Sequence, residues 1–113
     1  MPFIRTTTNV AVPGRKAEAI KQRMGEAIEL LPGKTESWLM IHLEGNATMF
    51  FKGEDENCAI CEVKLYGSAD EDSYAKLTSE LTDILREELD LDPDRIYVTY
   101  SEMDTWGWNG GNL

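Results

Sequence analysis

Residues 15–31 read RKAEAIKQRMGEAIELL, and their apolar side chains recur at intervals of three and four. This spacing places the apolar side chains on one face of an amphipathic helix. The positions concerned are Ala17, Ile20, Met24, Ala27, Ile28 and Leu31. Pro32-Gly33 is a combination that ends helices, so the sequence predicts a helix from Arg15 to Leu31.

A second helix is predicted after Asp70-Glu71-Asp72, because acidic side chains suit the positive end of the helix dipole. Its apolar side chains again recur at steps of three and four, at Tyr74, Leu77, Leu81, Ile84, Leu85 and Leu89. Three apolar residues of the first helix return 57 positions later as leucines, which indicates an internal repeat. The matching pairs are Ile20 with Leu77, Met24 with Leu81, and Ile28 with Leu85.

Extended segments flank both helices. Residues 2–8 contain three threonines, which favour a strand. Residues 38–43 form a nearly continuous apolar run, which predicts a strand covered on both faces. Residues 58–66 and 96–100 read as two further strands, and residues 48–51 as a short one.

Each half of the chain therefore reads strand, helix, strand. Two right-handed βαβ units side by side give a mixed four-stranded sheet with both helices on one face. The predicted fold class is α+β, in a single domain that covers residues 1–113. Because the middle strands read as apolar on both sides, the second face of the sheet must be buried. Another copy of the chain is the simplest candidate to cover it.

The composition limits the possible partners. The formal charge is −10, from 21 acidic and 11 basic residues. Nucleic acids and anionic membranes need a positive surface, so neither is expected as a partner. An anionic substrate would have to be attracted by a local positive group.

Other sequence features exclude several classes of protein. No run of 18 apolar residues exists, so no membrane span is expected. The first residues lack the regions of a secretory signal, which predicts a cytoplasmic protein and leaves leaderless secretion open. His42 is the one histidine, and no cluster of histidines and cysteines exists, so we expect neither a metal site nor a cofactor. In an apolar run, His42 reads as a hydrogen-bonded core residue.

Short motifs follow one another along the whole chain: Met1-Pro2-Phe3-Ile4, Thr8-Asn9-Val10, Gly33-Lys34, Ile41-His42-Leu43, Cys58-Ala59-Ile60-Cys61, Ser73-Tyr74-Ala75-Lys76-Leu77, Pro93-Asp94-Arg95-Ile96-Tyr97-Val98 and Gly107-Trp108-Asn109. In this order and spacing the motifs resemble the macrophage migration inhibitory factor family. The resemblance implies a homotrimer of two-βαβ subunits with active sites at the subunit interfaces. It also implies keto–enol tautomerisation of phenylpyruvate-like 2-oxo acids and isomerisation of dopachrome-like compounds.

The resemblance implies that Pro2, freed by removal of Met1, is the general base. Proton transfer next to a carbonyl needs a base that is neutral near pH 7 and a group that holds the enolate. An α-amino group has an ordinary pKa of about 8, and desolvation lowers that pKa toward neutrality. Alternatively, Pro2 only begins an edge strand. If Met1 is retained, the Pro2 nitrogen is an amide and cannot act as a base.

Lys34 is the local positive group, and the resemblance implies that it binds the substrate carboxylate. Lys34 could instead complement the dipole at the end of the first helix. Tyr97 matches a tyrosine that reaches the pocket from the neighbouring subunit, although a core aromatic between strands would look the same. Trp38 matches an aromatic near the pocket rim and could equally be a core residue.

Four further substrate-binding candidates follow from the same resemblance. Trp108 belongs to the matching Gly-Trp pair. Thr99 stands where the family often carries an asparagine that hydrogen-bonds a substrate hydroxyl. Tyr66 replaces an isoleucine that lines the pocket, and Trp106 replaces a small aliphatic residue. These changes leave open which aromatic 2-oxo acid is the substrate.

Two other functions stay open. Cys58 and Cys61 suggest a thiol oxidoreductase, but residues three apart in a strand point to opposite faces and lie about 10 Å apart. A disulfide needs Cα atoms within about 7 Å, so we expect two buried structural cysteines. The family also includes a secreted cytokine, which makes a receptor-binding signalling protein with a vestigial pocket the other alternative.

Overall fold

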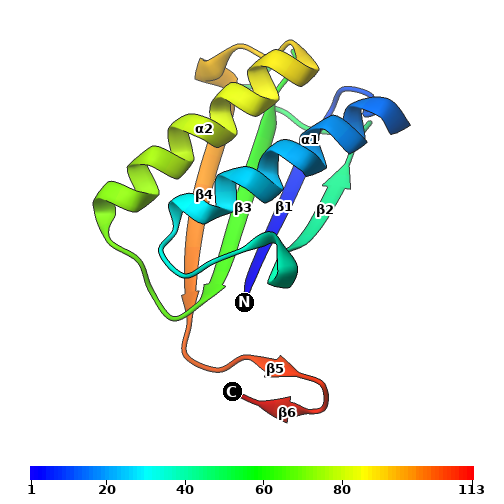
Figure 1. The fold of residues 1–113 in the computed structure, drawn as a ribbon. Helices are drawn as coiled ribbons and strands as arrows, with labels where there is room; N and C mark the ends of the chain where they lie inside the picture. The colour runs from blue at the N-terminus through cyan, green and yellow to red at the C-terminus, as the bar shows by residue number, and fades with distance from the viewer.

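Four strands form one mixed sheet in the order β2-β1-β3-β4, and both α helices cover the same face of it (Figure 1). The computed structural model describes residues 1–113 in full. The strands are β1 (Pro2–Thr8), β2 (Met40–Glu44), β3 (Ala59–Tyr66) and β4 (Ile96–Met103). β1 is parallel to β2, β3 is parallel to β4, and β1 and β3 are antiparallel. The predicted α+β fold of two βαβ units is confirmed.

The two helices begin and end close to their predicted bounds. α1 spans Gly14–Ala27 and continues as the short 3-10 helix η1, Ile28–Leu30. α2 spans Glu71–Leu89 and is capped by Asp70, whose carboxylate accepts a hydrogen bond from the Ser73 N–H at 2.7 Å. This bond to the ionised carboxyl holds the pKa of Asp70 below its usual range.

The core lies between the helices and the sheet. Both predicted helix faces point into it, and fully buried leucine and isoleucine side chains each contribute about 1.5–3 kcal/mol. The helices supply Ile20, Met24, Ile28, Leu77, Leu81, Ile84 and Leu85, and the sheet supplies Ile4, Cys61, Val63 and Leu65. Tyr74 is only half-buried, because its hydroxyl donates to Glu102 at 2.6 Å at the edge of the sheet.

The prediction of one strand over residues 38–43 is wrong in two respects. Glu36–Trp38 forms a 3-10 helix, η2, and the strand begins only at Met40. Exposed and half-buried residues alternate along β2, so only one of its faces is covered. The prediction of a core histidine is wrong as well, because His42 lies on the exposed face. β2 is an edge strand with helices on one side, and its outer face meets no other element.

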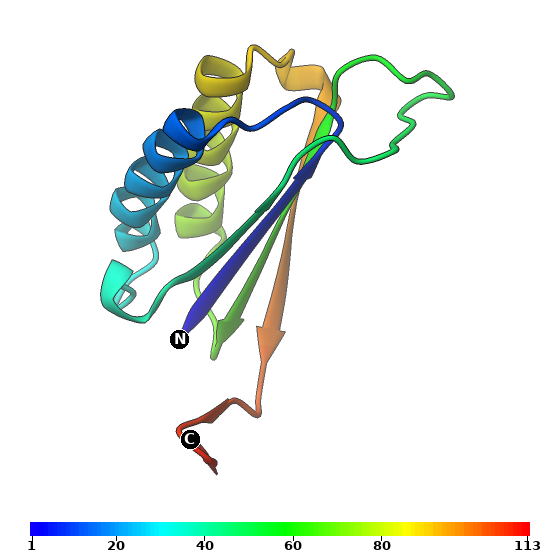
Figure 2. The same cartoon turned by 90° about the vertical axis from the view of Figure 1, so that its right-hand side faces the viewer.

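Residues 48–51 do not form a strand. They lie in the loop between β2 and β3, at the end of the sheet far from the N-terminus (Figure 2). The loop contains a single bridge, in which the Phe51 N–H donates to the Glu54 carbonyl at 2.9 Å.

The face of the sheet away from the helices is open, with polar residues at its centre and apolar residues toward its ends, such as Phe3 and Met40 at one end and Tyr97 at the other. A row of residues in register crosses its centre from strand to strand: His42, Arg5, Glu62 and Thr99. Within this row the Arg5 Nε donates to a Glu62 carboxylate oxygen at 3.1 Å. The expectation that the middle strands are apolar on both sides is therefore wrong for this face, since β3 alternates apolar with charged residues.

The C-terminal residues form a small hairpin of β5 (Gly107–Trp108) and β6 (Gly111–Asn112). It lies beyond the end of the sheet at which the N-terminus is found (Figures 1 and 2). No helix of the structure combines the length and the apolar character that crossing a membrane requires.

Candidate active site

A cleft of about 490 Å³ lies where β1 begins, lined by residues from the end of the sheet and from the C-terminal hairpin. Four segments of the chain line it, and most of the lining residues are apolar. These segments supply Met1, Pro2 and Phe3, then Ser37, Trp38, Leu39 and Met40, then Lys64, and finally Trp106, Gly107 and Trp108. A planar apolar molecule with a few polar groups is the kind of ligand that such a lining suits.

Pro2 is buried at the start of β1, where the missing N–H of a proline is tolerated. Its partner across the antiparallel pair is Leu65. The carbonyl of Met1 accepts a hydrogen bond from the Tyr66 N–H at 3.0 Å, which extends the pairing by one step. With Met1 attached, the Pro2 nitrogen is an amide, and the free amine of the chain belongs to Met1.

Lys34 lies beside that free amine. Gly33 has a φ of +81°, a conformation that favours glycine, and this turn brings Lys34 back toward the sheet after the helix. The Lys34 Nζ donates to the Tyr66 carbonyl at 3.0 Å. Burial, followed by the positive charge of Lys34, lowers the pKa of the Met1 amine below its ordinary 8.0.

All three tryptophans of the chain line the cleft: Trp38, Trp106 and Trp108. The rings of Trp38 and Trp108 meet edge to face, with centroids 5.1 Å apart. This contact joins the hairpin to η2, and about half of each of the two rings stays exposed. Trp38 is thus a rim residue and not part of the core.

Two predicted site residues lie elsewhere. Tyr97 is in register with Ile60 and Thr7, five positions along β1 from Pro2, which corresponds to about 16 Å. Its ring is 58% exposed and meets Phe51 edge to face. Thr99 lies in the polar row at the centre of the open face, and neither residue lines the cleft.

Tyr66 contributes through its main chain. The Tyr66 N–H donates a hydrogen bond to the Met1 carbonyl, and the Tyr66 carbonyl accepts one from the Lys34 ammonium. The last residue of β3 thus links the start of the chain to the lysine. The structure therefore brings together Pro2, Lys34, Tyr66, Trp106 and Trp108 at one end of the sheet.

Sequence reasoning missed Lys64, Met40 and Phe3 as cleft residues. The three lie side by side in register on β3, β2 and β1. The alternation of apolar and charged residues along β3 is a signal that Lys64 faces away from the core, but only the register places it beside Phe3.

The two cysteines are free and buried. Burial raises the pKa of the Cys61 thiol to about 11, and the Thr6 hydroxyl donates to its sulfur at 3.4 Å. Reactive cysteines are exposed and have a lowered pKa, so Cys61 has the character of a structural residue.

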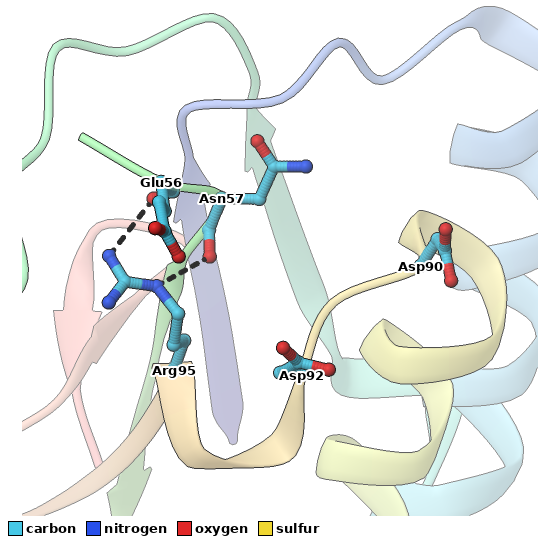
Figure 3. A pocket seen from close by; sticks show the side chains of 5 residues that line it. All are labelled: Glu56, Asn57, Asp90, Asp92 and Arg95. Carbon is cyan, nitrogen blue, oxygen red and sulfur yellow. Dashed lines mark hydrogen bonds between the residues drawn. The ribbon is translucent and has the colours of Figure 1, made fainter. Parts of the chain in front are cut away.

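A separate hollow of about 440 Å³ lies at the other end of the sheet, and its lining has no apolar residue (Figure 3). Arg95 closes one side of it and donates to the carbonyls of Asn57 at 3.0 Å and Glu56 at 3.1 Å. The guanidinium thus anchors the loop before β3. Asp90 and Asp92 make up the other side of the hollow.

Comparison with known proteins agrees with the fold and the motifs. The family described as macrophage migration inhibitory factor (MIF) matches residues 1–113. The chain belongs to this family. The MIF protein of the gerbil Meriones unguiculatus is 31% identical over 121 aligned positions, which cover 100% of this chain and 99% of that one. The MIF homolog of the nematode Brugia malayi is 26% identical, again over 100% of this chain and 99% of the relative.

Solved structures of MIF proteins have the same architecture. The crystal structure of MIF2 from Leishmania major superposes with a TM-score of 0.94 at 25% identity, covering 100% of this chain and 97% of that one. The MIF homologue of Prochlorococcus marinus gives a TM-score of 0.88 at 26% identity, with 97% of each chain covered.

Proposed function

We propose that this MIF-family chain is a tautomerase for aromatic 2-oxo acids of the phenylpyruvate type, with Pro2 as the general base once Met1 is removed. The observation that carries the proposal is the position of Pro2, buried at the start of β1 in an apolar cleft with Lys34 close by. MIF proteins belong to the tautomerase superfamily, which supports an isomerase.

The basicity of Pro2 follows from its surroundings. The amine of Met1, one residue further out, already has a pKa below its ordinary value because of burial and Lys34. After removal of Met1 the chain begins with the secondary amine of Pro2, at a buried position next to the same lysine. Both causes then act on the Pro2 nitrogen and lower the pKa of its amine, which favours the unprotonated form that accepts a proton.

The reaction needs few groups. The Pro2 nitrogen takes a proton from the carbon next to the 2-oxo group, and the electron pair of that bond forms the C=C bond of an enolate. The proton is delivered to the oxygen, so keto and enol forms interconvert without change in composition. Lys34 binds the carboxylate and favours the charge that develops on the adjacent enolate.

The complete site is proposed to form in a homotrimer. Tyr97 lies about 16 Å along the sheet from Pro2 of its own chain and is largely exposed. A neighbouring copy can supply Tyr97 to the cleft, whereas its own chain cannot. The open face of the sheet leaves this residue accessible to such a neighbour.

The proposal is tested by an alanine inserted between Met1 and Pro2. Phenylpyruvate tautomerisation is measured for the wild-type chain and the insertion variant, and mass spectrometry establishes which N-terminus each preparation carries. The insertion makes the Pro2 nitrogen an amide, so turnover should be lost while the circular dichroism spectrum is retained. Equal turnover in a folded insertion variant would refute Pro2 as the base. Absence of turnover in processed wild-type protein would favour the receptor-binding alternative, with which family membership is equally consistent.

A further inference from the structure

We propose that Lys64 is a second anion-binding side chain of the cleft, and that it selects aromatic 2-oxo acids bearing another acidic group on their ring. The inference rests on the proposed function, because it assigns a substrate class to the same cleft. Lys64 lies on β3, and its neighbours in register are Phe3 on β1 and Ser101 on β4.

The position of Lys64 ties it to the reacting end of the cleft. Leu65, the next residue, is the partner of Pro2, so Lys64 is one step along the strand from the residue opposite the base. It lines the same cleft as Pro2 and the tryptophans, and its side chain is exposed. A flexible lysine stem can place its ammonium over the cleft opening.

The ammonium of Lys64 has no carboxylate partner within 4.0 Å, although an acidic residue lies two positions away on the same face. Glu62, two residues away on the same face, is paired with Arg5 at 3.1 Å. Glu102 is in register with Leu65, on the other face of the sheet, where it accepts a hydrogen bond from the Tyr74 hydroxyl at 2.6 Å. Each of these carboxylates is engaged elsewhere, which leaves the lysine available to a ligand.

Two lysines with different surroundings lie at this end of the sheet, Lys64 in the cleft lining and Lys34 beside Met1. Lys34 is half-buried, tethered to the Tyr66 carbonyl, and lies beside the chain start. Lys64 is exposed on the sheet face, among apolar cleft residues. In a chain of charge −10, one lysine in the cleft lining and another beside Met1, a lining residue, oppose the general repulsion of anions. A ligand with two separated acidic groups and a ring between them fits this arrangement.

The test uses the three tryptophans as the reporter. All of them line the cleft, so intrinsic fluorescence measures occupancy with no signal from tryptophans elsewhere. Two unreactive probes are titrated, phenylacetate with one carboxylate and 4-carboxyphenylacetate with two. The variants are Lys64→Met, Lys64→Arg and, as the matched control, Lys76→Met, which removes an exposed lysine from α2.

We expect the wild-type chain to bind the dianion about tenfold more tightly than the monoanion, equivalent to about 1.4 kcal/mol. Lys64→Met should abolish this ratio without weakening the monoanion more than about twofold, whereas Lys64→Arg and Lys76→Met should preserve it. A ratio that is unchanged in Lys64→Met, or equally reduced in Lys76→Met, would overturn the proposal.

The same comparison with substrates separates this inference from the proposed function. The ratio of kcat/KM for 4-carboxyphenylpyruvate over phenylpyruvate should fall about tenfold in Lys64→Met. If the chain lacks turnover but still binds the dianion more tightly than the monoanion in a way that depends on Lys64, the tautomerase proposal fails and the anion-binding role of Lys64 is supported. If turnover depends on a free Pro2 but Lys64→Met changes neither the binding ratio nor the kcat/KM ratio, the tautomerase proposal is supported and the anion-binding role of Lys64 is refuted.

Discussion

Replacing Lys34 with methionine removes a charge beside the chain start and retains an unbranched side chain. Lys34 donates to the Tyr66 carbonyl at 3.0 Å and adds to the lowering of the pKa of the terminal amine. The substitution should therefore have two separable effects in the processed enzyme. The substrate carboxylate should bind more weakly, and the base should have a higher pKa.

The first effect appears in KM. A hydrogen bond to a charged partner contributes about 1.5–3 kcal/mol, and each 1.4 kcal/mol is a factor of ten. We expect KM for phenylpyruvate to rise by about 10- to 150-fold, with a smaller change in kcat. Lys34 is only half-buried, so water weakens the contact and favours the lower part of that range.

The second effect appears in the pH profile. Burial is the larger cause that lowers the pKa of the Met1 amine, and the charge of Lys34 is the next; we expect both to act on the Pro2 amine once Met1 is removed. Loss of the lysine removes only the second cause. The ascending limb of kcat/KM should therefore move to higher pH in Lys34→Met, by the part of the shift that the lysine charge causes, since burial remains.

Steady-state tautomerisation of phenylpyruvate and of its methyl ester, followed across the pH range, measures both effects. The ester has no carboxylate, so its KM should change little in the variant. Lys76→Met again serves as the control for net charge. An equal rise in KM for acid and ester, or an ascending limb that moves to lower pH, would contradict the roles assigned to Lys34.

Three further outcomes are expected. Sedimentation equilibrium should give a homotrimer, and a stable monomer at micromolar concentration would contradict the shared site. The free energy of unfolding should fall between pH 9 and 11, because the thiol of Cys61 ionises at about 9 when unfolded and about 11 when folded. Urea titrations should show a smaller fall in Cys61→Ala. Asp70→Ala removes the N-cap of α2 and should lower the free energy of unfolding by about 1 kcal/mol in the same assay. An unchanged midpoint of urea unfolding would contradict a stabilising role of this cap.

The two helices could be predicted from sequence because each has a long periodic pattern with clear end signals. The faces that contain Ile20 and Leu77 are buried as expected. The apolar run at residues 38–43 was ambiguous, since a short run has no period by which a 3-10 turn can be told from a strand. Trp38 and Met40 are apolar because they line a cleft, not because they enter the core.

The candidate site could be predicted only where a residue carries its own chemical signal. Pro2 and Lys34 stand at recognisable positions near a chain start and a helix end. Lys64 has no such signal, because its place beside Phe3 depends on the register between β1 and β3. The separation of Tyr97 from Pro2 likewise follows from pairing across the sheet, which local patterns do not specify.

The hydrogen bond between the Met1 carbonyl and the Tyr66 N–H gives N-terminal processing a second consequence. Cleavage of the Met1–Pro2 bond removes the acceptor together with the residue. The Tyr66 N–H then has no main-chain partner at the mouth of the cleft, while the carbonyl of the same residue still holds Lys34. Under the proposed mechanism, one hydrolysis would therefore change two groups together: it would turn the Pro2 amide into the amine that acts as the base, and it would leave the Tyr66 N–H free to bind a substrate oxygen.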